Sequence, residues 1–117
     1  GGVVYYANYL RFCERARTER LRELGVNQGE LRAQTGLVFV VRHVEADYLR
    51  SAVLDDELHV VSTVSDVGAA TLRFTQTILR GETRLFQAIT TIACVDIERA
   101  RAARIPDDLR RLFESQA

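Results

Sequence analysis

Residues 1–24 read GGVVYYANYLRFCERARTERLREL, and this stretch decides the fold. Its apolar residues recur at close to the helical period, at Tyr6, Tyr9, Leu10, Cys13, Ala16, Leu21 and Leu24. Gly25 follows, where a residue in the left-handed conformation would end a helix. The pattern predicts a glycine turn that leads into one helix over residues 6–24, about 28 Å long at the helical rise.

Charged residues occupy the other faces of this predicted helix. Arg15 precedes Glu19 by four residues, and Glu14 precedes Arg17 by three, so both pairs are spaced to meet on a helix surface. We therefore expect a solvent-exposed charged stripe. Within it, Glu14 forms a surface ion pair and does not serve as a general base.

The sequence after this helix is typical of strands. A continuous apolar run, LVFVV, opens a stretch that then alternates in polarity, and three later stretches alternate as well. The predicted strands cover residues 37–49, 57–67, 70–80 and 84–97. Alternation along the last of them places Leu85 and Phe86 on opposite faces. Gly81 and Glu82 form a tight hairpin turn, and such short turns make neighbouring strands antiparallel.

Two shorter helical segments complete the predicted order. One is a helical turn over residues 29–33, and the other is a closing helix over residues 107–114, which Pro106 precedes. One long helix followed by a single antiparallel sheet predicts an α+β fold in which the sheet wraps the helix, the hotdog arrangement. We expect residues 1–117 to form one such domain, because this length suits a single core.

The composition argues against several classes of protein. The net charge is zero, which gives no electrostatic support for a nucleic-acid partner. No apolar run approaches the roughly 20 residues that a membrane-spanning helix needs, and no secretory leader is visible. Cys13 and Cys94 lack the spacing of a metal or redox motif, which indicates a reducing compartment and simple packing. We therefore expect a cytoplasmic protein with no nucleic-acid partner and no transmembrane segment.

The first residues predict that a further element precedes them. The sequence contains no Met, even at position 1, and it opens within a turn. We expect a leading strand ahead of Gly1, so that the domain is incomplete at its N-terminus.

Several short motifs along the chain resemble those of a known family. They are GVVYYANY (residues 2–9), FCERARTE (12–19), FVVR (39–42), LDD (54–56), FTQ (74–76) and CVD (94–96). Together they resemble the bacterial acyl-CoA thioesterases associated with the Tol-Pal system. These enzymes belong to the 4-hydroxybenzoyl-CoA thioesterase group of hotdog proteins. The resemblance covers nearly the whole chain.

This resemblance implies an activity and an assembly. The implied reaction hydrolyses an acyl-CoA thioester to a free acid and CoA, and CoA is part of the substrate. No metal or redox cofactor is implied. The implied assembly is a sheet-paired homodimer, often a homotetramer, with the site at the dimer interface near the start of the long helix. Substrates carried on an acyl carrier protein are a further possibility that the resemblance leaves open.

The resemblance also assigns the catalytic groups. The family's key aspartate lies two positions ahead of Gly1 and is therefore outside this chain. Tyr6 matches the position whose backbone N–H points at the thioester carbonyl. Physical chemistry supports that role, because the first N–H groups of a helix lack partners and the dipole adds positive charge there. Relatives often carry His at this position, but a Tyr side chain cannot carry a proton near neutral pH, so the backbone is the expected catalyst.

Two further groups of residues are expected to bind substrate. Gly2, Asn8 and Tyr9 match the first motif, although Asn8 could instead bond to backbone at the helix start. Arg99 and Arg101 lie two apart, so in extended backbone they leave on the same side. The resemblance places basic residues there to meet the nucleotide phosphates of CoA, which arginine forks suit.

Alternatives to this arginine site remain open. The three arginines near the last strand, Arg104 included, could belong to a solvated tail that pairs with Glu98 or Asp107. In relatives a basic residue often stands in the turn at residues 68–70, which read GAA here, so CoA would depend on the arginines or on a neighbouring subunit.

Other polar residues are expected to be structural. His43 and His59 fall on polar strand faces and are expected to face solvent. The run DDE at residues 55–57 is expected to be a turn and not a metal site, because no histidine is spaced to complete one.

Two other functions are compatible with the same scaffold. One is a non-catalytic module that binds acyl-CoA or an acyl carrier protein, which would bind ligand without turnover. The other is an interaction protein that docks on lipid-synthesis or envelope partners by its sheet edges, which would not bind CoA.

Overall fold

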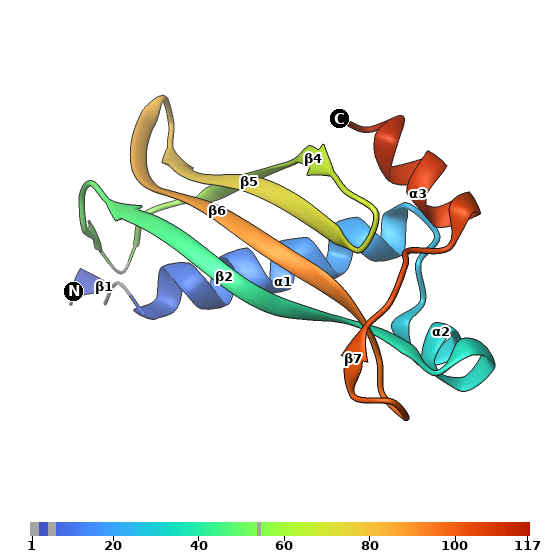
Figure 1. The fold of residues 1–117 in the computed structure, drawn as a ribbon. Coiled ribbons are helices and arrows are strands. Elements are labelled where there is room, and N and C mark those ends of the chain that lie inside the picture. The colour runs from blue at the N-terminus through green and yellow to red at the C-terminus, as the bar shows by residue number, and fades with distance from the viewer. Residues whose placement is uncertain (1–2, 5–6, 54) are drawn as a thin grey trace.

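The long helix α1 runs from Ala7 to Glu23 and lies against one face of an antiparallel sheet (Figure 1). The computed structural model describes residues 3–4, 7–53 and 55–117, and within them four long strands form this sheet in the order β2-β6-β5-β4. The strands are β2 (Leu37–Tyr48), β4 (His59–Val67), β5 (Thr71–Arg80) and β6 (Thr83–Asp96). The predicted α+β fold is confirmed, and each strand bound lies within two residues of its prediction.

Shorter elements surround this sheet. The helices α2 (Gln28–Thr35) and α3 (Asp107–Glu114) correspond to the predicted helical turn and closing helix. Three two-residue strands were not predicted: β1 (Val3–Val4) pairs with β3 (Ala52–Val53), and β7 (Arg101–Ala102) pairs with the end of β6. Within the described residues, no helix is long and apolar enough to cross a membrane.

Helix α1 runs antiparallel to β2. Near the end of α1, Leu21 belongs to the same core cluster as Phe39, which lies near the start of β2. Near the start of α1, the Tyr9 hydroxyl donates to the carbonyl oxygen of Arg50, just after the end of β2, at 2.9 Å. The start of α1 therefore lies beside the end of β2 (Figure 1).

The end of α1 is capped as the sequence predicts. Gly25 adopts the left-handed conformation, with φ of 92°, and its N–H donates to the carbonyl of Arg22 at 3.0 Å. The next residue, Val26, donates to the carbonyl of Leu21 at 2.9 Å and is itself buried. This cap turns the chain toward α2 because glycine takes a positive φ at no steric cost.

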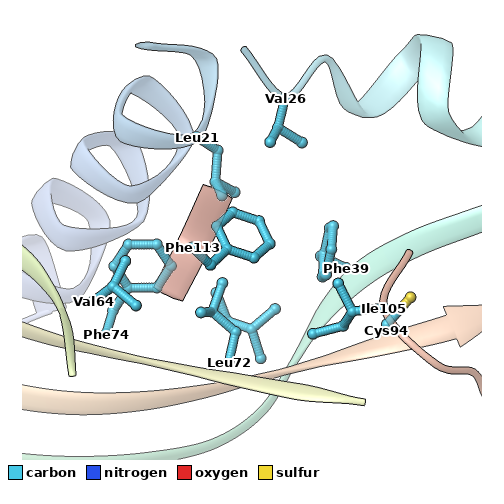
Figure 2. Packing of buried hydrophobic residues seen from close by; sticks show 10 residues of the cluster. Leu21, Val26, Phe39, Val64, Leu72, Phe74, Cys94, Ile105 and Phe113 are labelled. Atoms are coloured by element: carbon cyan, nitrogen blue, oxygen red, sulfur yellow. The ribbon is translucent and has the colours of Figure 1, made fainter. Parts of the chain in front are cut away.

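A buried cluster joins α1, the sheet and α3. Figure 2 shows Phe113 of α3 at the centre of this cluster, between Leu21 of α1 and Phe74 of β5. The rings of Phe39 and Phe113 meet edge to face with centroids 5.9 Å apart. The cluster therefore holds α1, α3 and the sheet together at the end of the sheet near α3.

The prediction that Leu85 and Phe86 lie on opposite faces is wrong, because both belong to the same core cluster. Ile78 pairs with Phe86 and Leu79 with Arg84, so the register shifts by one residue and leaves Leu85 without a directly paired residue on β5. Both Leu85 and Phe86 are fully buried. The cause is a β-bulge, because an extra residue on one strand interrupts the alternation of faces.

Candidate functional site

The first turn of α1 is the part of the predicted catalytic site that the structure describes. Gly2 and Tyr6 lie outside the described residues, so the structure gives no position for the predicted backbone donor. Asn8 is half-buried in the first turn of the helix. N–H groups in this turn lack acceptors within the helix and carry the positive end of its dipole.

Tyr9, which is predicted to bind substrate, lies in the core near the start of α1. Its side chain is fully buried, and its ring centroid lies 5.4 Å from that of Phe86. Its hydroxyl already donates to the carbonyl of Arg50. The ring therefore anchors the start of α1 to the sheet, because the helical period turns it toward β6.

An exposed apolar strip borders the start of α1. On β2, Val41, Val44 and Tyr48 pair with Ile92, Thr90 and Phe86 of β6, respectively, and these three β6 residues are all buried on the face that α1 covers. The three β2 side chains share this inner face, yet they are 52%, 39% and 41% exposed. Leu10 of α1, 40% exposed, lies on the same side of the helix as Glu14. We call Leu10, Val41, Val44 and Tyr48 the inner-face strip.

A buried polar network lies beneath the middle of α1. The Arg17 guanidinium Nη1 donates to the Gln76 side-chain oxygen at 2.9 Å. The Gln76 amide nitrogen donates to the carbonyl of Cys13 and to the Ser62 hydroxyl, both at 2.8 Å. Burial lowers the pKa of Arg17 and raises the pKa of the Cys13 thiol to about 11. The network therefore ties α1 to β4 and β5 through polar groups that are withdrawn from solvent.

The predicted surface pair between Glu14 and Arg17 is wrong. Arg17 is only 9% exposed and points under the helix, while Glu14 is exposed. The sequence held a signal for this, because Arg17 lies four residues from both Cys13 and Leu21 and so shares their buried face.

Beside this network is a cavity of about 140 Å³ between α1 and β2. Arg17, Glu14 and Thr18 line it from the helix, and Phe39 and Val41 line it from β2. A larger cavity of about 460 Å³ lies on the other side of α1, facing β4, with Phe12, Leu58 and Val60 among its lining residues. Only the smaller cavity adjoins the inner-face strip, through Val41.

Arg99 lies in the turn between β6 and β7, Arg101 is the first residue of β7, and Arg104 follows that strand. Arg99 is exposed, and its Nη1 lies 3.5 Å from Asp96 Oδ2. Arg101 is exposed and opposite Asp96 in the β6–β7 register. Arg104 lies 3.8 Å from Asp107, as the solvated-tail alternative predicted, whereas Arg99 pairs with Asp96 and not with Glu98. Both predicted phosphate ligands are therefore accessible, and each is near a carboxylate.

Within one chain, the structure does not bring the start of α1 close to Arg99 and Arg101. The start of α1 is tied to Phe86, and the arginine turn follows Asp96 at the other end of the same strand. These ends are about 33 Å apart at the rise of a strand. Figure 1 shows β7 and the start of α1 at opposite ends of the sheet.

The two histidines are exposed, as predicted. His43 and His59 are exposed beside Glu45 and Glu57, at 3.4 Å and 3.9 Å. Asp56 accepts a hydrogen bond from the Val53 N–H and pairs with Arg80, and these contacts hold its pKa below the usual value. Among the described residues, no group of three or more His, Cys, Asp or Glu side chains is placed to hold a metal ion.

One long helix packed against a single antiparallel sheet, with the helix start beside an open apolar strip, defines a protein of the hotdog fold. Residues 1–113 match the family model described as the thioesterase-like superfamily, and the chain belongs to this family.

Named relatives and a solved structure agree with this membership. The chain is 42% identical over 113 residues to "Acyl-CoA thioesterase YbgC" of Haemophilus influenzae, covering 97% of this chain and 83% of that protein. It is 38% identical over 115 residues to "Acyl-CoA thioester hydrolase YbgC" of Escherichia coli O6:H1, covering 97% and 85%. The crystal structure of a probable thioesterase from Bartonella henselae is 39% identical, with a TM-score of 0.81 over 90% of this chain and 86% of that chain.

Proposed function

We propose that this protein is an acyl-CoA thioesterase, which hydrolyses an acyl-CoA thioester to a free acid and CoA. The observation that carries the proposal is the start of α1, which lies beside the exposed inner-face strip. An acyl group can lie on that apolar strip while its carbonyl oxygen faces the helix N–H groups. The activities named for the relatives are of this class.

In the proposed mechanism, α1 stabilises the charge that develops on the thioester oxygen. The backbone N–H of Tyr6 is the donor that the family resemblance assigns, with the helix dipole adding to its effect. One such donor contributes about 3 kcal/mol to transition-state stabilisation. The aspartate that the resemblance places two positions ahead of Gly1 would attack the carbonyl or activate water. No metal or redox cofactor takes part in this proposal.

The proposed assembly is a homodimer that pairs along β2, alone or within a homotetramer. β2 is an edge strand, and a second copy paired antiparallel to it would reverse the direction of the sheet. The Arg99 and Arg101 turn of one copy would then approach the start of α1 in the other. This explains how two groups about 33 Å apart in one chain can serve one substrate.

The site proposed here therefore combines parts of two copies. Asn8 and the start of α1 come from one copy and hold the thioester. Arg99 and Arg101 come from the other and bind the nucleotide phosphates of CoA through charge-assisted hydrogen bonds. A cytoplasmic location, an association with the Tol-Pal system and an acyl carrier protein as a partner are further parts of the proposal. The free cysteines Cys13 and Cys94 support the location, and the resemblance supports the association with the Tol-Pal system.

The activity is tested by the release of free thiol from a panel of acyl-CoAs, from short aliphatic to long-chain and aroyl, with the full-length protein. We expect turnover of at least one class. Binding without turnover would instead identify a non-catalytic acyl-CoA module, and absence of both would overturn the proposal.

The assembly is tested by light scattering after size-exclusion chromatography. Val40 on β2 is 42% exposed, and Val61 on the other edge strand, β4, is 49% exposed. We expect Val40→Lys to dissociate the dimer and to abolish turnover, while the matched control Val61→Lys leaves the dimer intact. Equal effects of the two variants would contradict pairing along β2.

A further inference from the structure

Arg17 is a buried cation that is attracted to the nearby Glu14 but donates its hydrogen bond to a neutral group. The side chain is 9% exposed, and its hydrogen bond goes to the neutral Gln76 amide. Among residues 3–4, 7–53 and 55–117, no carboxylate forms an ion pair with it at 4.0 Å or less, although seven other ion pairs occur there. A buried charge is costly unless it is paired and hydrogen-bonded, so this guanidinium has unused capacity to bind an oxygen acceptor.

Gln76 fixes the orientation of the Arg17 guanidinium and therefore the direction of its other N–H groups. Its amide nitrogen is held by the Cys13 carbonyl and the Ser62 hydroxyl, so its oxygen must face Arg17. Gln76 is itself fully buried. One edge of the planar guanidinium is therefore fixed against β5, and a guanidinium held in this way keeps other N–H groups in a defined direction.

Arg17 also lines the 140 Å³ cavity between α1 and β2. This volume is close to that of a cavity of about 150 Å³ that accepts a benzene ring. The walls include Phe39, Val41 and Ile92, which are apolar, and Glu14 and Thr18, which are polar. A small group that is mostly hydrocarbon but carries an oxygen atom fits this lining.

The cavity lies further along β2 than the part of the inner-face strip that is nearest the start of α1. Val41 belongs both to the cavity and to the inner-face strip, which runs along β2 from Tyr48. Arg17 follows Ala7 by ten residues, about 15 Å at the helical rise, and helical side chains lean back toward the helix start. An acyl group whose thioester lies at the start of α1 would therefore direct its far end toward Arg17.

We propose that Arg17 determines acyl specificity by donating hydrogen bonds to an oxygen atom at the far end of the acyl group. This inference rests on the proposed thioesterase function. The preferred substrates are acyl-CoAs whose acyl group carries a distal oxo or hydroxyl group, in place of plain hydrocarbon chains. Glu14 lines the same cavity, so a distal carboxylate is disfavoured relative to a neutral oxygen by the like charge.

The test compares matched substrates in the thiol-release assay. Hexanoyl- to decanoyl-CoA are each compared with the counterpart that carries a distal oxo, hydroxyl or carboxylate group. We expect the wild-type protein to prefer the oxo and hydroxyl compounds roughly 10- to 100-fold in kcat/KM, the range for a hydrogen bond to a charged group. The carboxylate compounds should rank below them.

Three variants test whether the preference for a distal oxygen depends on Arg17, and a fourth is held in reserve. Arg17→Met removes the guanidinium and should bring the ratio close to one. Gln76→Glu supplies a carboxylate of the same shape to Arg17 and should reduce the ratio in the same way. Arg15→Met removes an exposed arginine from the other side of α1 and should leave both the ratio and the turnover of plain acyl-CoAs unchanged. Thermal unfolding of each variant checks that it folds, and Arg17→Lys, which keeps the charge but loses the fork, is used if Arg17→Met does not.

The outcomes distinguish this inference from the proposed function. Turnover of plain and oxygen-bearing substrates at equal efficiency by the wild type, or a preference that survives in both Arg17→Met and Gln76→Glu, would overturn the role of Arg17 while leaving the thioesterase intact. If no acyl-CoA is hydrolysed, the proposed function fails. In that case, calorimetry measures the dissociation constants of the plain and the oxygen-bearing acyl-CoAs. The ratio of these constants, compared between the wild type and Arg17→Met, decides whether Arg17 recognises the distal oxygen.

Discussion

Removal of the Phe113 ring should lower the free energy of unfolding more than any other single substitution in α3. Of the residues of α3, Phe113 alone is buried, with no exposed surface, and its ring meets Phe39 edge to face. Figure 2 shows it inside the cluster that joins α1 to the sheet. Phe113→Ala would leave a cavity among these residues and would weaken the attachment of α3, whose other contacts with the cluster come from the partly buried Leu109 and Leu112.

The expected cost is about 4 kcal/mol, within the usual range for truncating a buried Phe to Ala. This is a large part of the total stability of a domain of this size, which is about 5–15 kcal/mol. The measurement is urea unfolding followed by circular dichroism, at one fixed protein concentration because assembly also adds stability. Leu112→Ala is the matched control, since Leu112 is only partly buried in the same helix and should cost about 1–2 kcal/mol. A cost below about 1 kcal/mol for Phe113→Ala would show that α3 does not depend on this anchor.

Three further predictions concern the turns and the arginine site. Ala100 has a φ of 51°, which disfavours any residue with a Cβ, so Ala100→Gly should raise the free energy of unfolding by about 1 kcal/mol in urea titrations; a loss of stability would contradict the strain. Replacing Arg99 and Arg101 together by Ala should raise KM more than it lowers kcat, because phosphate contacts bind the ground state and the transition state equally; an unchanged KM would exclude their phosphate role. The pKa of Asp56 is lowered by the Val53 N–H and by Arg80, so its contribution to stability is present above the unfolded pKa and is lost as the pH falls through the lower folded pKa. Unfolding measured across that acidic range should be less dependent on pH in Asp56→Asn, and an unchanged profile would exclude Asp56 as a source of the dependence.

The helices and strands follow from local information in the sequence. The period of apolar residues placed α1, and the left-handed Gly25 confirms where that helix ends. Pro106 and the acidic residues after it predicted the bounds of α3 correctly. These features depend on residues within one or two turns of each other, so a single sequence contains the information that determines them.

Contacts between distant residues could not be predicted in the same way. Arg17 was assigned to the surface from its near neighbours, but its hydrogen-bond partner, Gln76, is 59 residues away. The bulge at Leu85 depends on how β6 pairs with β5, which alternation along one strand does not reveal. For the site, the sequence identified Arg99 and Arg101 as accessible cations but gave no sign that β6 separates them from the start of α1.

The two edge strands of the sheet, β2 and β4, differ in how many apolar side chains they expose. This difference suggests how the start of α1 and the distant arginines could form one site. On β2, the exposed apolar residues Val40, Val41 and Val44 lie within five positions of one another, whereas Val61 is the exposed apolar residue among the described positions of β4. An edge strand that exposes several apolar side chains favours pairing with another strand, and proteins avoid leaving such an edge uncovered. A second copy on β2 would cover this edge and would also lie over the inner-face strip. The same contact that removes apolar surface from water would then complete the acyl-binding groove, so loss of assembly and loss of turnover should occur together in β2 variants.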